Sequence, residues 1–365
     1  MLHRMNALSS LTGTVMAGGW PMARVMAGMS AVPVGHAIDL ALFFPNDDLT
    51  RHDALIAETR RHLGGCVAAV EMAMRLSFDH APHIAAALDR WPEPLVWPMV
   101  RAQPTLLGPG LLAHMQMRAG VTLMLRQSGE ADLERPGEAA SDLPTADDPD
   151  LGDAVSALAL TEGRWLMLGG EDRPMRPDLP AEHYAELVWT VAACLAAVAQ
   201  RTMPDGGDAL LGAFERSGWA LLTDHDEAAG PIAQADQLVR RMGDRADSLT
   251  LVGAALDQRR FLLFTALAAR RLRLDSVQVA DMLVLGPLSD VALLCRALGG
   301  SDSDYRHLLI ALRPVRPALS DVAIVAEAER YQMLNDGDVD LAIGALRTPA
   351  AFRAKLDHLR AVCPA

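Results

Sequence analysis

Apolar residues recur at helical spacing along nearly the whole chain from Ile38 onward. Between residues 51 and 76 the apolar positions repeat at steps of three, four and seven, and polar capping residues precede this segment at 46–50. Proline or glycine separates the helices that follow, which are predicted over 81–90, 92–101 and 106–126. Alternating strand patterns and hairpin dipeptides are absent from the sequence. The pattern therefore predicts an all-α protein.

The C-terminal part adds a periodic arrangement to this helical pattern. Two longer helices are predicted over 151–168 and 181–200. Beyond them, serine or aspartate precedes successive apolar runs, as expected for N-capping residues. First helices of successive pairs are expected near 248, 276, 303 and 338, and second helices near 258, 289, 320 and 349. The second series is spaced by 31, 31 and 29 residues, which predicts an α-α superhelix of HEAT-like helix pairs. An ordinary bundle with well-capped helices is the alternative.

The segment 128–150 interrupts the helical pattern. It holds eight acidic residues and three prolines with almost no large apolar side chains, so it is predicted to be a solvated acidic linker. Four parts are thereby expected: a loosely ordered N-terminal extension (1–36), a smaller N-terminal helical domain (37–127), the linker, and a C-terminal helical-repeat domain (151–365). Glycines, prolines and Arg24 interrupt the apolar run of the extension, which argues against a membrane span or a signal peptide and favours a cytoplasmic protein.

Charge and composition narrow the classes of partner. The 365 residues carry a formal net charge of −13, and no basic field is visible that would favour nucleic acid or a membrane surface. Lys355 is the only lysine, which disfavours P-loop and Schiff-base chemistry. The four cysteines form no Cys-x-x-Cys pair, and three of them lie in apolar helical contexts typical of buried thiols.

Candidate chemistry is sparse. The cluster Asp224-His225-Asp226-Glu227 could bind a metal but is more typical of an exposed loop, and His80 and His83 with Asp79 are more typical of a surface cap. No catalytic, cofactor-binding or metal-ligating residue is therefore predicted, and no cofactor is expected.

Arginines are the only residues to which a function is assigned. The densest group lies around the apolar run 261–264, and a buried helix whose last turn carries basic residues is the alternative interpretation. Residues eleven apart on a helix differ by about 20° around its axis, so two pairs of these arginines are expected to share a face. The predicted partner-binding residues are Arg259, Arg260, Arg270, Arg271 and Arg273.

Several packing positions resemble a known family. They are Leu179-Pro180-Ala181-Glu182, Leu187-Val188-Trp189, Phe264-Thr265-Ala266-Leu267 and Phe352-Arg353. Across residues 37–362 the chain resembles an alphaproteobacterial all-helical family known only as a domain of unknown function, DUF 2336. The resemblance implies HEAT-like helix pairs without an assigned activity, so no functional residue is carried over from it.

These observations favour a non-enzymatic scaffold or adaptor for protein–protein interaction, with bacterial signalling as its expected setting. The partner is expected to be another protein rather than nucleic acid or a membrane, and a homo-oligomer stays open. The alternative is a sensory module that binds a small ligand between helices of the 181–274 region; an enzyme ranks third.

Overall fold

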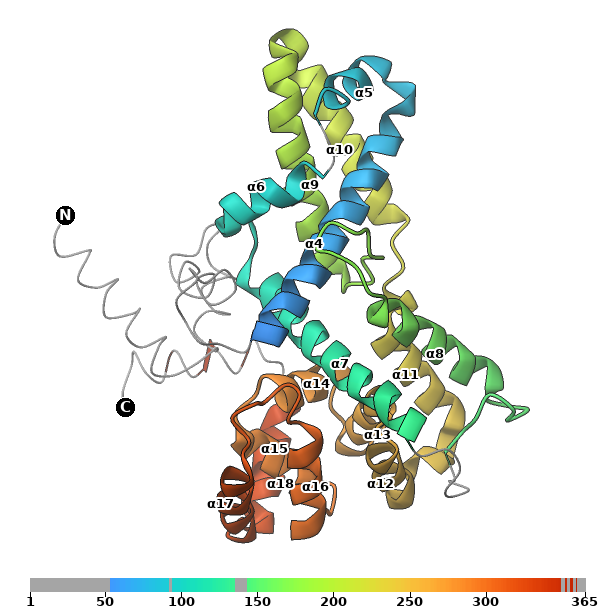
Figure 1. The fold of residues 1–365 in the computed structure, drawn as a ribbon, viewed down its shortest axis with the longest axis vertical. Coiled ribbons are helices and arrows are strands. Elements are labelled where there is room, and N and C mark those ends of the chain that lie inside the picture. Colours follow the sequence, from blue (N-terminus) through green and yellow to red (C-terminus); the bar gives the residue numbers. More distant parts are fainter. Residues whose placement is uncertain are drawn as a thin grey trace, which may run out of the picture.

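The structure is a computed structural model that describes residues 53–91, 94–134 and 143–348, together with 352, 355, 356 and 359. Within these residues it contains fifteen α-helices and no strand, which confirms the all-α prediction. The predicted extension 1–36 lies outside the described residues. Figure 1 shows an elongated molecule with two groups of helices, one above the other.

The first group surrounds an upper core. Its helices are α4 (Asp53–Leu76), α5 (Pro82–Leu88), α6 (Val96–Ala102), α9 (Ala181–Thr202) and α10 (Gly207–Thr223). The predicted apolar face of α9 is confirmed, because Leu187, Val191 and Leu195 are all fully buried there. Cys66 and Cys194 are buried in the same core, as expected for small apolar side chains.

The second group surrounds a lower core. Its helices are α8 (Gly152–Leu166), α11 (Pro231–Met242), α12 (Leu249–Asp257), α13 (Phe261–Leu272), α14 (Ser276–Val284), α15 (Leu288–Ala297), α16 (Asp302–Ala311), α17 (Asp321–Gln332) and α18 (Asp336–Leu346). Three predicted pairs begin within three residues of the expected positions: α12 with α13, α14 with α15, and α16 with α17. The second helix of the last pair, expected near 349, lies almost wholly outside the described residues.

The pairs stack along the chain but not as a strict nearest-neighbour array. Each of α13 to α17 packs against the helix before it, and α15 also packs against α18 (Figure 1). In a solenoid each pair contacts only its neighbours. The arrangement is compatible with a helical superhelix, and a regular HEAT-like repeat stays a prediction.

Helix α7 (Pro109–Glu134) belongs to both cores. Its first half contributes Leu111 and Met115 to the upper core, and its second half contributes Val121 and Leu125 to the lower core. Helices α9 and α10 follow the predicted linker in sequence, yet they pack with α4 in the upper core. The two cores therefore do not follow the predicted division into 37–127 and 151–365; residues from both sides of the linker form each of them.

The predicted linker is also shorter than 128–150. Helix α7 continues through residues 128–134, and Leu143 is buried in the lower core with only 6% of its surface exposed. Residues 135–142 lie outside the described part. Leu143 thus belongs to the lower core, which the composition of the segment does not indicate.

Two glycines in the middle of α4 allow another segment to cross it. A Cβ added to Gly64 would overlap the carbonyl oxygen of Glu171, and one added to Gly65 would lie 2.8 Å from Met175 Cβ. The Met175 amide donates to the Gly65 carbonyl oxygen at 2.9 Å. The two glycines thus permit close approach of the 167–178 segment, which lies between α8 and α9.

Candidate functional site

The structure separates the predicted arginine group into two. Arg259 and Arg260 precede α13, whereas Arg270, Arg271 and Arg273 lie at its C-terminal end. Eleven residues along a helix span about 16 Å, so the two groups lie at opposite ends of α13. Binding of a partner by these arginines stays a prediction.

Intramolecular contacts already occupy part of the C-terminal group. Arg270 Nε and Nη2 donate to the two carboxylate oxygens of Asp247 at 2.8 and 3.1 Å, and Arg271 Nη1 donates to the Asp247 carbonyl oxygen at 3.2 Å. The hydrogen bond from Arg270 lowers the pKa of Asp247. These two arginines thereby complement the end of α13 and fix the 243–247 turn, as the alternative interpretation anticipated.

The other candidate residues perform local structural roles. His225 Nε2 donates to the Leu179 carbonyl oxygen at 2.8 Å and stacks on Tyr184, while Asp226 caps the short turn that follows it. Glu227 accepts from the Ala181 amide at the start of α9. Among the residues that the structure describes, no group of three or more His, Cys, Asp or Glu side chains could hold a metal ion.

An exposed apolar surface lies along α17 in the lower core. We call it the α17 face: Val322, Val325 and Met333 from α17 and its C-cap. Val322 is 80% exposed, Val325 51% and Met333 85%. Val322 and Met333 are eleven residues apart, so they lie on one side of α17. Large apolar side chains gathered on one surface are typical of a contact area.

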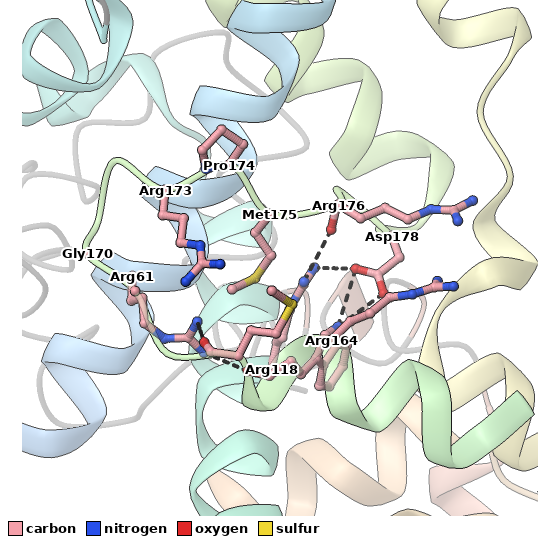
Figure 2. Close-up of a pocket in the computed structure, with 12 residues that line it drawn as sticks. Arg61, Arg118, Arg164, Gly170, Arg173, Pro174, Met175, Arg176 and Asp178 are labelled. Carbon is pink, nitrogen blue, oxygen red and sulfur yellow. Dashed lines mark hydrogen bonds and ion pairs between the residues drawn. The ribbon is translucent and has the colours of Figure 1, made fainter. Parts of the chain in front are cut away.

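Cavities also lie among the described residues. One, of about 220 Å³, lies between α12, α13, α15 and α16 and is lined mainly by apolar side chains such as Leu256, Phe264 and Leu308. Burial raises the pKa of its Cys295 thiol to about 11, so this thiol is protonated at neutral pH. Another, of about 190 Å³, lies beside the 167–178 segment and is lined by five arginines (Figure 2).

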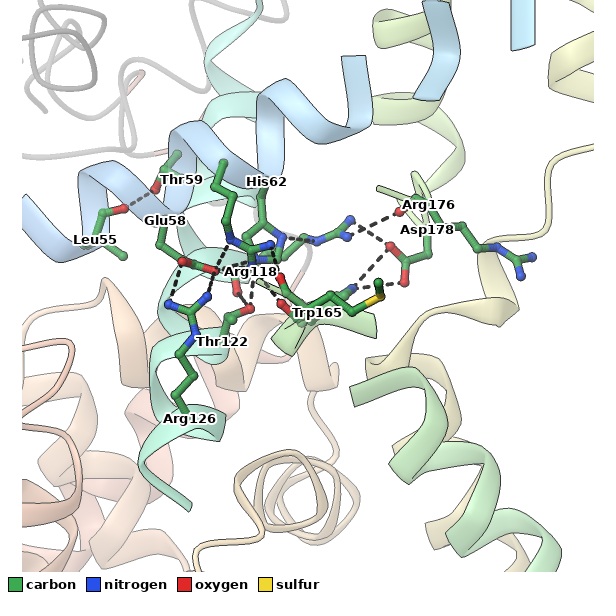
Figure 3. A network of polar contacts seen from close by, with 12 residues as sticks. Leu55, Glu58, Thr59, His62, Arg118, Thr122, Arg126, Trp165, Arg176 and Asp178 are labelled. Carbon is green, nitrogen blue, oxygen red and sulfur yellow. Dashed lines mark hydrogen bonds and ion pairs between the residues drawn. The ribbon is translucent and has the colours of Figure 1, made fainter. Parts of the chain in front are cut away.

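A buried carboxylate begins the polar network next to the arginine-lined cavity (Figure 3). Glu58 of α4 is 4% exposed, and its carboxylate accepts from Arg61 Nε at 3.0 Å and pairs with Arg126 Nη1 at 2.9 Å. Burial alone would raise the pKa of Glu58, but hydrogen bonds from His62 and Arg61 outweigh it and lower the pKa to about 2. The carboxylate is therefore ionised throughout the physiological range.

His62 is held neutral within this network. Arg118 Nε donates to His62 Nδ1 at 2.8 Å, so the ring carries its proton on Nε2, which lies 3.1 Å from the Glu58 carboxylate. The pKa of His62 is lowered to about 3, mainly because the ring is buried. The positive charges of Arg118 and Arg61 also lower this pKa, whereas the hydrogen bond with Glu58 raises it. A neutral histidine bridging a carboxylate and an arginine connects α4 to α7.

Arg118 and Asp178 complete the network as a buried ion pair. Their side chains are essentially inaccessible to solvent, and Nη1 lies 2.8 Å from Oδ1. Trp165 Nε1 donates to Asp178 Oδ2 at 3.1 Å, and the Arg118 guanidinium lies 4.6 Å from the centre of the Trp165 ring. The ion pair thus joins α7, α8 and the segment before α9 at the junction of the two cores (Figure 3).

No sequence motif indicates a role for Glu58, His62, Arg118 or Asp178. The available signal was the presence of charged or polar residues inside predicted apolar helices, such as Arg118 between Met117 and Ala119. That signal marks a buried polar group without identifying its partner.

Comparisons of the chain with protein-family models, with curated proteins and with solved structures found no match. The resemblance to DUF 2336 stays a prediction. None of the helices in the described ranges combines the length and the apolar character that crossing a bilayer requires.

Proposed function

We propose that this protein is a non-enzymatic, cytoplasmic helical scaffold that binds a segment of another protein on the α17 face. The observation that carries the proposal is the exposure of Val322, Val325 and Met333 along one side of α17. Exposed apolar side chains gathered on one surface promote association with another molecule. A bound partner would remove this apolar surface from water.

The charge around the α17 face indicates the chemistry of the partner. Residues 319–348 hold six acidic and two basic residues, and the exposed carboxylates include Glu329, Asp338 and Asp340. An amphipathic helix with an apolar stripe flanked by lysine or arginine would complement both properties.

The test uses a synthetic amphipathic helical peptide of leucine and lysine, labelled for fluorescence anisotropy. We expect the double variant V322S/M333S to weaken binding by tenfold or more, because each buried Val or Met side chain contributes about 1.5–3 kcal/mol. Leu160→Ser on α8 is the matched control, since Leu160 is also 68% exposed but lies on the other side of the lower core. A peptide of the same composition without the apolar stripe should bind weakly.

Two results would contradict the proposal: equal loss of affinity in the control, or unchanged affinity in the double variant. The same assay tests the predicted arginines, because charge reversal of Arg260 and Arg271 to glutamate would alter capture only if these residues contact the partner.

A second function, binding of a small ligand, is favoured by the apolar cavity of about 220 Å³. It lies partly within the 181–274 region expected for a sensory module, through Leu249, Val252 and Phe264. Native mass spectrometry of gently purified protein distinguishes the two functions. A co-purifying small molecule supports the sensory module, whereas a co-purifying protein whose retention depends on Val322 and Met333 supports the scaffold.

A further inference from the structure

The arginine-lined cavity lies where three helices meet the 167–178 segment. Arg61 comes from α4, Arg118 from α7 and Arg164 from α8, while Arg173 and Arg176 come from the segment itself. Figure 2 shows Arg61 and Arg173 on one side of the cavity, Arg164 and Arg176 extending toward the other, and Arg118 with Asp178 between them. Gly169 and Gly170 form part of the wall without side chains that could fill the space.

Positive charge at this cavity is not balanced by its own lining. Asp178 is the only carboxylate among the lining residues, and its ion pair with Arg118 neutralises both groups. Arg61 is balanced by Glu58 behind it. No ion pair in the described part of the chain involves Arg164, Arg173 or Arg176. Three solvent-exposed arginines without an ion pair thus line a small cavity of a protein whose net charge is −13.

The hydrogen-bond donors at the cavity outnumber the acceptors. Arg61 Nη1 donates to the Met167 carbonyl oxygen at 2.8 Å and Nη2 donates to that of Trp165 at 2.7 Å, which fixes the guanidinium at the cavity wall. Arg173 is bound through Nη1 to the Leu168 carbonyl oxygen at 2.5 Å, which leaves most of its five N–H groups available. The Asp178 carboxylate already accepts from Trp165 and contacts Arg118.

We propose that this cavity binds a small oxyanion, either a phosphate group or a carboxylate. The forked donors of Arg173 bind it, together with the one N–H group of Arg61 Nη1 that Glu58 and the two carbonyl oxygens leave available. Forked guanidinium donors match both groups in geometry, and a partly enclosed site strengthens the attraction. The volume of about 190 Å³ sets the size of the ligand. A cavity of about 150 Å³ accommodates benzene, so this one accepts inorganic phosphate or a compact organic acid rather than a nucleotide.

Thermal unfolding of the full chain tests the site with three probes: inorganic phosphate, sulfate and succinate, each compared with chloride at matched ionic strength. We expect a concentration-dependent rise in melting temperature with at least one of them. A larger effect of phosphate and sulfate identifies a tetrahedral ligand, and a larger effect of succinate identifies a carboxylate. The dissociation constant of the most effective probe is then measured by calorimetry.

Arg173→Gln removes the charge from the cavity, and Arg201→Gln is the matched control because Arg201 is an exposed arginine at the end of α9. We expect R173Q to weaken probe binding by at least tenfold while R201Q leaves it unchanged, with the helical circular dichroism of both variants intact. The proposal is overturned if none of the three probes stabilises the wild-type protein more than chloride does. It is also overturned if both variants lose affinity equally, since that result would indicate general charge screening.

Discussion

Replacing one member of the Arg118–Asp178 ion pair should destabilise the protein strongly. Both side chains are excluded from solvent, so Arg118→Met leaves the Asp178 carboxylate buried with only the Trp165 indole as a donor. Loss of one partner of a buried pair costs about 3–5 kcal/mol. The total stability of a protein is about 5–15 kcal/mol, so the variant should lose a large fraction of it. Asp178→Asn should cost a similar amount.

Urea unfolding followed by circular dichroism at neutral pH measures both free energies. The double variant R118M/D178N should be more stable than the sum of the two single losses predicts, because it leaves no uncompensated charge. We expect a coupling free energy of about 2 kcal/mol or more between the two positions. Arg201→Met is the control, and an exposed position of this kind should change stability by less than about 0.5 kcal/mol. Losses below about 1 kcal/mol in the single variants, or strict additivity in the double variant, would refute the coupling.

Three further predictions concern the same junction. Acid should lower the free energy of unfolding as the pH falls from about 6.5 toward 2. In the folded state His62 stays neutral and Glu58 stays ionised, whereas both groups bind protons more readily in the unfolded chain. His62→Gln should therefore flatten the upper part of the profile of unfolding free energy against pH. Gly65→Ala should lower the melting temperature, since the new methyl group would lie 2.8 Å from Met175 Cβ, and an unchanged melting curve would show that the 167–178 segment yields easily. Cleavage at a protease site engineered within 135–142 should give two fragments that co-elute in size-exclusion chromatography, because each core contains residues from both sides of the cut. Separate elution of the fragments would instead support two independent domains.

Local structure followed from the sequence to a large extent. The helix expected over 51–76 is α4 at Asp53–Leu76, and the one expected over 181–200 is α9 at Ala181–Thr202. Both depend on signals contained within the segment itself, namely apolar periodicity and polar or proline residues at the ends. The helix expected near 320 is capped by Ser320, and the helix expected near 303 is capped by Ser301 and begins at Asp302.

Long-range packing could not be predicted in the same way. Arg118 meets Asp178 across 60 positions of sequence, and no local pattern indicates which of many polar residues will become partners. The spacing of the arginine group shows a different limit of local patterns. Helical periodicity gives the angle of Arg260 and Arg271 around the axis, but their separation along it places them at opposite ends of α13.

The shared role of α7 has a consequence for synthesis of the chain. Once α7 has been made at residue 134, the upper core still lacks α9 and α10, which end at residue 223. Ribosomes add about 5–20 residues per second, so the apolar faces of α4 and α7 wait on the order of 5–20 s for their partners. Neither core can close before its late helices arrive, and α7 must serve both. The nascent protein therefore exposes a large apolar surface during elongation, the period in which chaperone binding or aggregation would decide its fate.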